Sequence, residues 1–273
     1  MAEKVYMDLG DVQKTLFLPL WGRAVETQKE NPLLRDPKAV EVVKAVDLDL
    51  AQLYEKLDDL SQIAWIKRSL IADQMIGRFL QKHPEGTVVN LGCGLDTTFD
   101  RVDNGQVRWF DLDLADVISL RRCFIQESDR RTFLAASFLD EDWFTEIPKD
   151  QPVFFLAAGV FYYFEAEKIE TFFLRLMAGF PGCELLFDVS SPAGVKIANQ
   201  KVIENSGLDE RSYLTWGLVD KKDVLAWDPG LKLIGEYHYY RNMKLSLRNF
   251  LMGKLSDFLG IQYMLHLQLG EAN

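Results

Sequence analysis

Residues 87–101 read TVVNLGCGLDTTFDR, and this short stretch decides the fold. Apolar, strand-forming residues lead into a Gly-x-Gly turn at Gly92 and Gly94, and the chain then becomes polar and helix-like. A strand, a glycine turn and a helix in this order bring backbone close to a ligand. The pattern is typical of a loop that binds a dinucleotide, and also of one that binds S-adenosylmethionine (SAM).

The third position of the motif separates these two ligands. The dinucleotide fingerprint G-x-G-x-x-G/A needs a third small residue, so that helix and strand approach closely around a pyrophosphate. That position is Thr97 in this chain. SAM has no pyrophosphate and needs only the tight turn. The motif therefore favours SAM and leaves a nicotinamide-dependent oxidoreductase as the alternative.

Two acids follow about 20 residues after the turn, where such a fold holds a ribose. The segment WFDLD ends a strand-like run with Asp111 and Asp113. One carboxylate at a strand end accepts hydrogen bonds from both hydroxyls of a ribose. We expect Asp113, the nearer to the strand end, to do so. Both NAD and SAM carry this diol, so the acids predict an adenosine-type ligand without naming it.

Strand-like and helix-like segments alternate after residue 86, which predicts a mostly parallel sheet with helices on both faces. The first 85 residues read as helical, and residues 192–220 form an insertion. We expect residues 1–85 and this insertion to cap a core of residues 86–273, within one structural domain. The seven strand candidates are 87–92, 107–113, 131–137, 153–158, 183–189, 231–240 and 261–269, the last two nearer an edge.

Composition narrows the range of partners. The longest apolar run, residues 153–164, is shorter than the roughly 20 residues of a membrane helix, so we expect a soluble, cytoplasmic protein without membrane partners. A net charge of −10 disfavours a nucleic-acid substrate. The three cysteines and three histidines form no ligand cluster, so no metal is expected. Cys93 reads as a small residue in the turn.

Together, four stretches resemble the leucine carboxyl methyltransferase superfamily, and more closely its bacterial branch of tetracenomycin-type (polyketide) O-methyltransferases. The resemblance spans roughly residues 18 to 190. The stretches are LPLWGRAVETQKENPLLRDPKAVEVV (18–43), IKRSLIADQMIGRFL (66–80), VVNLGCGLDTTFDRV (88–102) and VRWFDLDLADVISLRR (107–122).

The resemblance implies a class I SAM-dependent methyltransferase fold, a seven-stranded Rossmann-like sheet with a helical cap. It implies that Arg68 grips the SAM carboxylate, as a planar guanidinium suits. It places the adenine at Ser137 and Phe138, where serine replaces an aspartate, and Ala158 stands where relatives carry glutamate. The predicted cofactor-binding residues are Arg68, Asn90, Gly92, Gly94, Asp111, Asp113, Ser137, Phe138 and Ala158.

We expect the methyl acceptor to be a small molecule with a carboxylate or hydroxyl oxygen. A carboxylate is already ionised at neutral pH, whereas a phenol benefits from a general base, for which His238 is the candidate. A non-catalytic SAM-binding protein stays an alternative, and the sequence assigns neither a catalytic residue nor an oligomeric state. The predicted acceptor-pocket residues are Trp21, Arg23, Tyr162, Tyr163, Tyr213, Trp216 and Arg241.

Overall fold

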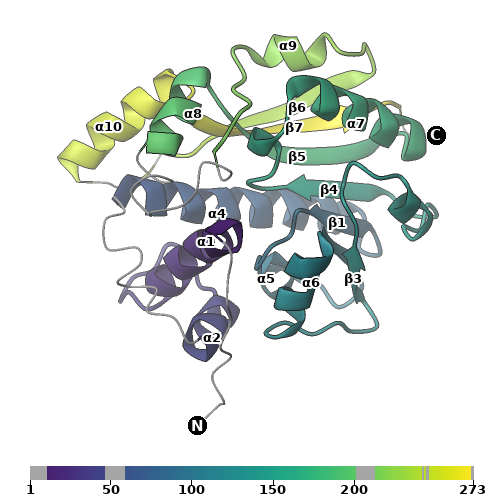
Figure 1. The fold of residues 1–273 in the computed structure, drawn as a ribbon, viewed down its shortest axis with the longest axis horizontal. Coiled ribbons are helices and arrows are strands. Elements are labelled where there is room, and N and C mark those ends of the chain that lie inside the picture. The colour runs from purple at the N-terminus through teal and green to yellow at the C-terminus, as the bar shows by residue number, and fades with distance from the viewer. Residues whose placement is uncertain (1–10, 47–58, 201–212, 242, 244–245, 272–273) are drawn as a thin grey trace.

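The computed structural model describes residues 11–46, 59–200, 213–241, 243 and 246–271. Their strands form one sheet in the order β3-β2-β1-β4-β5-β7-β6, with helices on both faces (Figure 1). The strands are β1 Thr87–Leu91, β2 Arg108–Asp113, β3 Arg131–Ala135, β4 Val153–Ala157, β5 Cys183–Ser190, β6 Leu231–His238 and β7 Gln262–Leu269. The α-helices are α1 Asp11–Thr27, α2 Pro37–Ala45, α4 Asp59–Lys82, α5 Thr98–Val102, α6 Ala115–Arg122, α7 Ala166–Gly179, α8 Pro192–Ala198, α9 Lys221–Leu225 and α10 Leu247–Phe258. Two short 3₁₀ helices are η1 Asp142–Thr145 and η2 Phe161–Tyr163.

The prediction of a mostly parallel sheet is confirmed. Strands β1 to β5 pair in parallel, and β7 alone runs antiparallel, to β5 on one side and β6 on the other. Of the two strands expected near an edge, only β6 is at the edge. β7 lies one place inside, and its residues Met264 and Leu265 are buried on opposite faces of the sheet.

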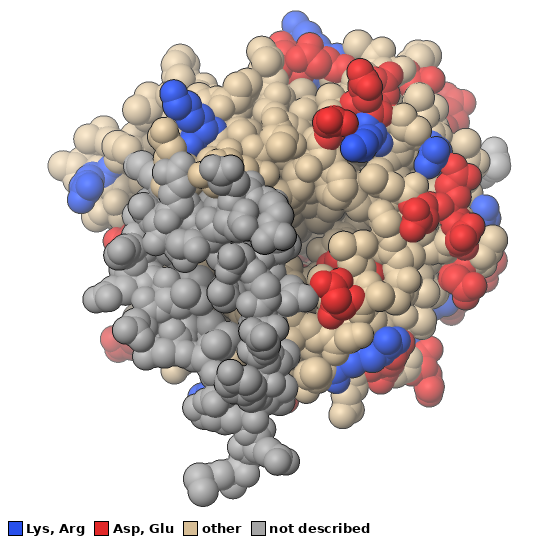
Figure 2. All heavy atoms as spheres, in the orientation of Figure 1, with Lys and Arg blue, Asp and Glu red and all other residues tan. Residues whose placement is uncertain are grey.

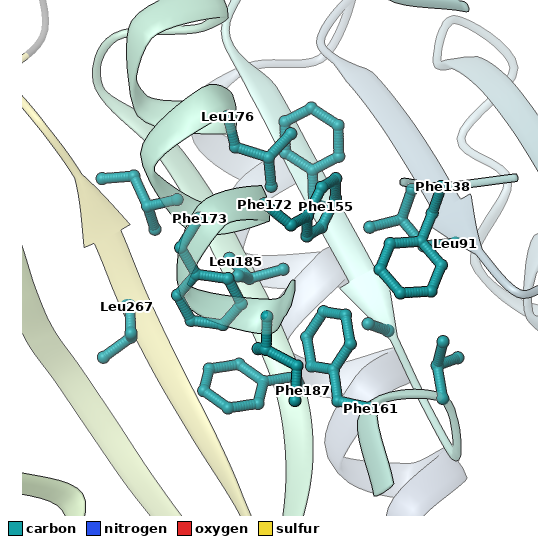
Figure 3. Packing of buried hydrophobic residues seen from close by; sticks show 14 of the residues in the cluster. Leu91, Phe138, Phe155, Phe161, Phe172, Phe173, Leu176, Leu185, Phe187 and Leu267 are labelled. Atoms are coloured by element: carbon teal, nitrogen blue, oxygen red, sulfur yellow. The ribbon is translucent and has the colours of Figure 1, made fainter. Parts of the chain in front are cut away.

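Alternation along the strands supplies both faces of the sheet. Val88 packs with α4 on one face, whereas Val89 packs with α7 on the other, because successive strand residues point to opposite sides. α7 turns Phe172, Phe173 and Leu176 toward the sheet (Figure 3). Each such side chain contributes about 1.5–3 kcal/mol on burial. Both faces are therefore covered, which leaves the carboxyl ends of the strands as the place for a site.

The helices that precede β1 occupy two places. α4 packs directly on the sheet, against β4, β5 and β7. α1 and α2 instead pack on each other and on residues around the glycine turn and α6, with Phe17, Leu20 and Val42 buried there. Three parts of the predicted cap, residues 1–10, 47–58 and 201–212, lie outside the described residues.

Candidate SAM site

A cavity of about 810 Å³ opens at the carboxyl ends of β1, β2 and β4. This is the edge where open α/β sheets bind ligands. Figure 2 shows the hollow near the middle of one face, walled mostly by residues other than Lys, Arg, Asp and Glu. α4, α8 and α10 also contribute to its wall. The volume lies toward the upper end of the range of about 300–1,000 Å³ for ligand sites.

The glycine turn forms the floor of the cavity. Gly92 and Gly94 both adopt positive φ, 58° and 45°, which glycine allows without strain. A Cβ on Gly92 would lie 2.6 Å from Val160 Cγ2, so a side chain there would also displace the loop after β4. Cys93, between them, is buried, and burial raises the pKa of its thiol well above the usual value. The thiol therefore stays protonated, in keeping with its interpretation as a small turn residue.

The two strand-end acids have different surroundings. Asp113 lines the cavity and accepts hydrogen bonds from Gly94 N (2.7 Å) and Leu114 N (2.8 Å). A carboxylate has about four lone-pair positions, so it can still accept from a ribose diol. Asp111 is fully buried and is not part of the cavity wall. Its Oδ2 is 2.8 Å from Arg121 Nη2 and 2.8 Å from Arg131 Nε, so its charge is already matched within the protein.

Thr97, which broke the dinucleotide fingerprint, joins the turn to the amino-terminal helices. Its hydroxyl donates to Asp36 Oδ2 (2.5 Å), and Asp36 caps α2 through Ala39 N. Arg23 Nε and Arg101 Nη1 also donate to Asp36 Oδ2, at 2.8 and 2.7 Å. A small residue at position 97 would leave this buried carboxylate with one donor fewer.

Arg68, on α4, also lines the cavity. Its Nη1 is 3.0 Å from Asp188 Oδ2, and its side chain keeps 14% of its surface exposed. Burial lowers the pKa of Arg68, but the Asp188 carboxylate outweighs this effect and the net pKa lies above the usual value. Arg68 therefore carries a permanent positive charge at the wall.

The remaining predicted cofactor residues also lie at the wall. Asn90 is buried and donates to Asp96 Oδ2 and Asp111 Oδ1, both at 3.2 Å. Ser137 Oγ accepts from Leu139 N at 3.2 Å, which leaves its O–H to donate to a ligand. Phe138 and Ala158 complete this side of the wall. Phe138 is held by edge-on contacts with the rings of Phe164 and Phe172.

The structure divides the predicted acceptor-pocket residues. Arg23, Tyr162 and Tyr163 line the cavity, although Arg23 is buried and donates to Asp36. Four others lie outside its wall, because core packing or exposure places them elsewhere. Trp21 and Tyr213 pack beside the α1–α2 cluster, Trp216 stacks on Trp227, and Arg241 is exposed.

His238, the candidate base, also lies away from the cavity. It stacks on Tyr263, and its Nε2 is 3.0 Å from Glu236 Oε1. Within the described residues, no histidine lines the cavity wall and no group of three or more His, Cys, Asp or Glu side chains is placed to hold a metal ion. The helices described here include none with the length and apolarity to cross a membrane.

Sequence reasoning missed several wall residues. Asp96, in the G-x-G-x-D turn, lines the cavity and accepts from Thr98 N at 3.0 Å. Burial would raise the pKa of Asp96, but the charges of Arg23 and Arg101 bring it well below the usual value. Ser61, Trp65 and Ser69 share the α4 face of Arg68, and their spacing of four residues was a usable signal. α10 adds Met252 and Leu255, and the residue after it adds Leu259; the sequence held no signal for these three.

Comparison with known proteins agrees with this geometry. A solved structure of a candidate methyltransferase from Thermobifida fusca superposes with a TM-score of 0.60 at 14% identity, over 93% of this chain and 95% of that one. The strand order, with one antiparallel strand inserted before the edge, and the glycine turn at the carboxyl ends define the class I SAM-dependent methyltransferase fold.

Sequence comparison identifies the family. The family model described as leucine carboxyl methyltransferase matches residues 17–177, more than half of the chain. The chain belongs to the leucine carboxyl methyltransferase family. It is 29% identical to the tetracenomycin polyketide synthesis O-methyltransferase TcmP of Streptomyces glaucescens, over 82% of each chain. It is 25% identical to the SAM-dependent methyltransferase dpfgK of Gibberella zeae, over 84% of this chain and 83% of that one.

Family membership decides between the two ligands that the glycine turn left open. The protein is a SAM-dependent O-methyltransferase, and SAM, not a nicotinamide, is its cofactor. For the same reason the protein is an enzyme, and the alternative of a non-catalytic SAM-binding protein is not supported.

Proposed function

We propose that this protein is a cytoplasmic enzyme that methylates a carboxylate oxygen of a largely apolar small molecule. The observation that carries the proposal is the composition of the cavity wall. The acidic wall residues lie at or after the ends of β1 and β2, whereas the wall toward α1, α4 and α10 is mostly apolar apart from Arg23 and Arg68. Apolar members of that part of the wall are Leu16, Leu18, Pro19, Leu60, Trp65, Met252, Leu255 and Leu259.

The residues at the strand ends fit the three parts of SAM. Arg68 offers guanidinium N–H groups to the amino-acid carboxylate, and Asp113 has lone pairs free for the ribose diol. Ser137 can donate to the adenine, beside the ring of Phe138. Bound there, SAM supplies a methyl group on a sulfonium: the S–CH₃ bond breaks as the C–O bond forms, and sulfur keeps the electron pair. Holding the acceptor oxygen in line contributes up to roughly 7–11 kcal/mol.

The protonation states of the wall residues favour a carboxylate acceptor, which needs no general base, over a phenol. Among the described lining residues there is no histidine to serve as a base. Burial, with the nearby Asp188 charge, raises the pKa of Tyr162 well above the usual value, so its phenol stays protonated. Tyr162 is therefore a hydrogen-bond donor rather than a base. The low pKa of Asp96 makes it a poor proton acceptor as well.

The pH profile of methyl transfer tests the acceptor class. We expect kcat/KM for an aromatic carboxylate, such as a naphthoic acid, to stay constant within about twofold between about pH 6 and 9, since the acceptor stays ionised over this range and needs no general base. The matched naphthol should react slowly, with a rate that rises as its own hydroxyl ionises. The measurement is transfer of labelled methyl from SAM. Faster turnover of the naphthol at pH 7 would contradict the carboxylate assignment.

A further inference from the structure

Asp188, near the carboxyl end of β5, links Arg68 to the loop that follows β4. The side chain is fully buried and lies outside the cavity wall. Its Oδ2 is 3.0 Å from Arg68 Nη1 on α4, and its Oδ1 accepts from Gly159 N at 2.7 Å. The two oxygens thus fix a charged side chain and a backbone turn in relation to each other.

The turn at Gly159 is shaped around the guanidinium. Gly159 adopts a φ of 84°, and a Cβ there would lie 2.8 Å from Arg68 Nη1. Gly159 and its neighbours Ala158 and Val160 all line the cavity. The position of Arg68 is therefore set on one side by Asp188 and on the other by the absence of a side chain at residue 159.

Asp188 occupies only part of the guanidinium. Within the described part of the chain, it is the one group that accepts a hydrogen bond from Arg68. An arginine has five N–H donors in a planar fork, so the edge facing the cavity remains available. The hydroxyl of Tyr162, from the same wall, is buried near Asp188, and burial together with this charge raises its pKa. The free edge of the Arg68 guanidinium thus faces the cavity without an acceptor among the described residues.

We propose that Asp188 is a positioning residue, which orients Arg68 so that its free edge meets the carboxylate of the SAM amino-acid end. The inference rests on the proposed role of Arg68 and adds a residue that does not touch the cofactor. Because Asp188 also holds Gly159 N, the same contact sets the loop that carries Tyr162 and Tyr163 toward the acceptor. Asp188 thereby couples the cofactor's carboxylate pocket to the acceptor side of the cavity.

The test compares two ligands that differ only at the amino-acid end. S-adenosylhomocysteine carries the carboxylate, whereas 5′-methylthioadenosine retains adenine, ribose and sulfur and lacks it. In Asp188→Asn, one amide oxygen replaces two acceptors and an NH₂ group faces the other donor. We expect calorimetry to show about a tenfold or greater rise in the Kd of S-adenosylhomocysteine, with the Kd of methylthioadenosine unchanged within about twofold.

A second pair of variants shows whether Asp188 acts through Arg68. If it does, the double variant Arg68→Ala with Asp188→Asn binds S-adenosylhomocysteine no more weakly than Arg68→Ala alone. Asp73→Asn is the matched control: Asp73 lies on α4, as Arg68 does, pairs with Arg101 of α5 at 2.8 Å, and lies outside the cavity wall. We expect it to leave both Kd values unchanged. Should Asp188→Asn not fold, Gly159→Ala displaces Arg68 from the other side. It is expected to weaken binding of S-adenosylhomocysteine more than binding of methylthioadenosine.

Two results would overturn the inference. One is an equal loss of affinity for both ligands in Asp188→Asn, which is expected if the ion pair has only a structural role. The other is binding of S-adenosylhomocysteine that is not weakened. Unchanged binding would mean that Asp188 does not orient Arg68, and tighter binding would mean that it competes with the cofactor for Arg68. Failure of the proposed function has a different signature, since Arg68→Ala would then leave the preference of the site for S-adenosylhomocysteine intact.

Discussion

Replacing Asp111 by asparagine is expected to lower the free energy of unfolding by about 3–5 kcal/mol, the cost of breaking a buried ion pair on one side. The carboxylate is fully buried, and Oδ2 accepts from both Arg121 and Arg131. Both guanidinium groups are themselves buried, at 0% and 3% side-chain exposure. Asparagine keeps the shape but removes the charge that the two cations share, which leaves Arg131 with Asp100 and Arg121 with backbone carbonyl groups. The measurement is urea denaturation of both proteins, followed by circular dichroism.

Asp113→Asn is the matched control, two residues along the same strand. Asp113 borders the cavity, and the two groups that donate to it are backbone N–H groups rather than cations. We expect a change in unfolding free energy of about 1 kcal/mol or less, because no buried charge loses its partner. Binding of S-adenosylhomocysteine should weaken instead. The reverse outcome, a stable Asp111→Asn and an unfolded Asp113→Asn, would exchange the roles assigned to the two acids.

These two acids also show where sequence reasoning ends. The period of two along a strand predicts that Asp111 and Asp113 share a face, and the position of β2 places both near the ligand edge. What the sequence does not reveal is that Arg121, from the following helix, and Arg131, from β3, converge on Asp111. A charge pairing of this kind depends on the packing of two other elements, so local pattern cannot assign it.

The same limit applies to the acceptor pocket and to the order of the last strands. The sheet was predictable because each strand is a short apolar run bounded by turn residues, which is local information. The aromatic residues predicted to line the acceptor pocket carry no such signal: Trp216 stacks on Trp227 in the core, whereas Tyr162 reaches the cavity, and both read alike in sequence. Likewise, the insertion of β7 between β5 and β6 depends on long-range pairing that alternation of apolar residues does not encode.

Family resemblance supplied what local pattern lacked at Arg68. On an amphipathic helix, a single arginine is usually a surface residue, and Arg78 on the same helix is one: it is exposed and outside the cavity wall. Arg68 instead contacts the buried Asp188 and faces the cavity. The two arginines therefore form a matched pair for testing the site.

Arg68→Ala is expected to weaken binding of SAM and S-adenosylhomocysteine by about 1.5–3 kcal/mol, the range for a hydrogen bond to a charged group. Arg68→Lys should recover only part of this loss, because an ammonium lacks the planar fork that matches a carboxylate. Arg78→Ala should bind as the unaltered protein does. Isothermal titration calorimetry on the four proteins, with methylthioadenosine as the second ligand, supplies the comparison.

Stability must be separated from binding in this series. Removing Arg68 leaves the buried Asp188 carboxylate with Gly159 N as its donor, so Arg68→Ala alone is expected to unfold at a lower temperature. The double variant Arg68→Ala with Asp188→Asn removes both charges and should regain much of that stability, while its affinity for S-adenosylhomocysteine stays low. If affinity returned together with stability, the guanidinium would be a structural counter-ion of Asp188, and the cofactor's carboxylate would have to be bound by other residues of the wall.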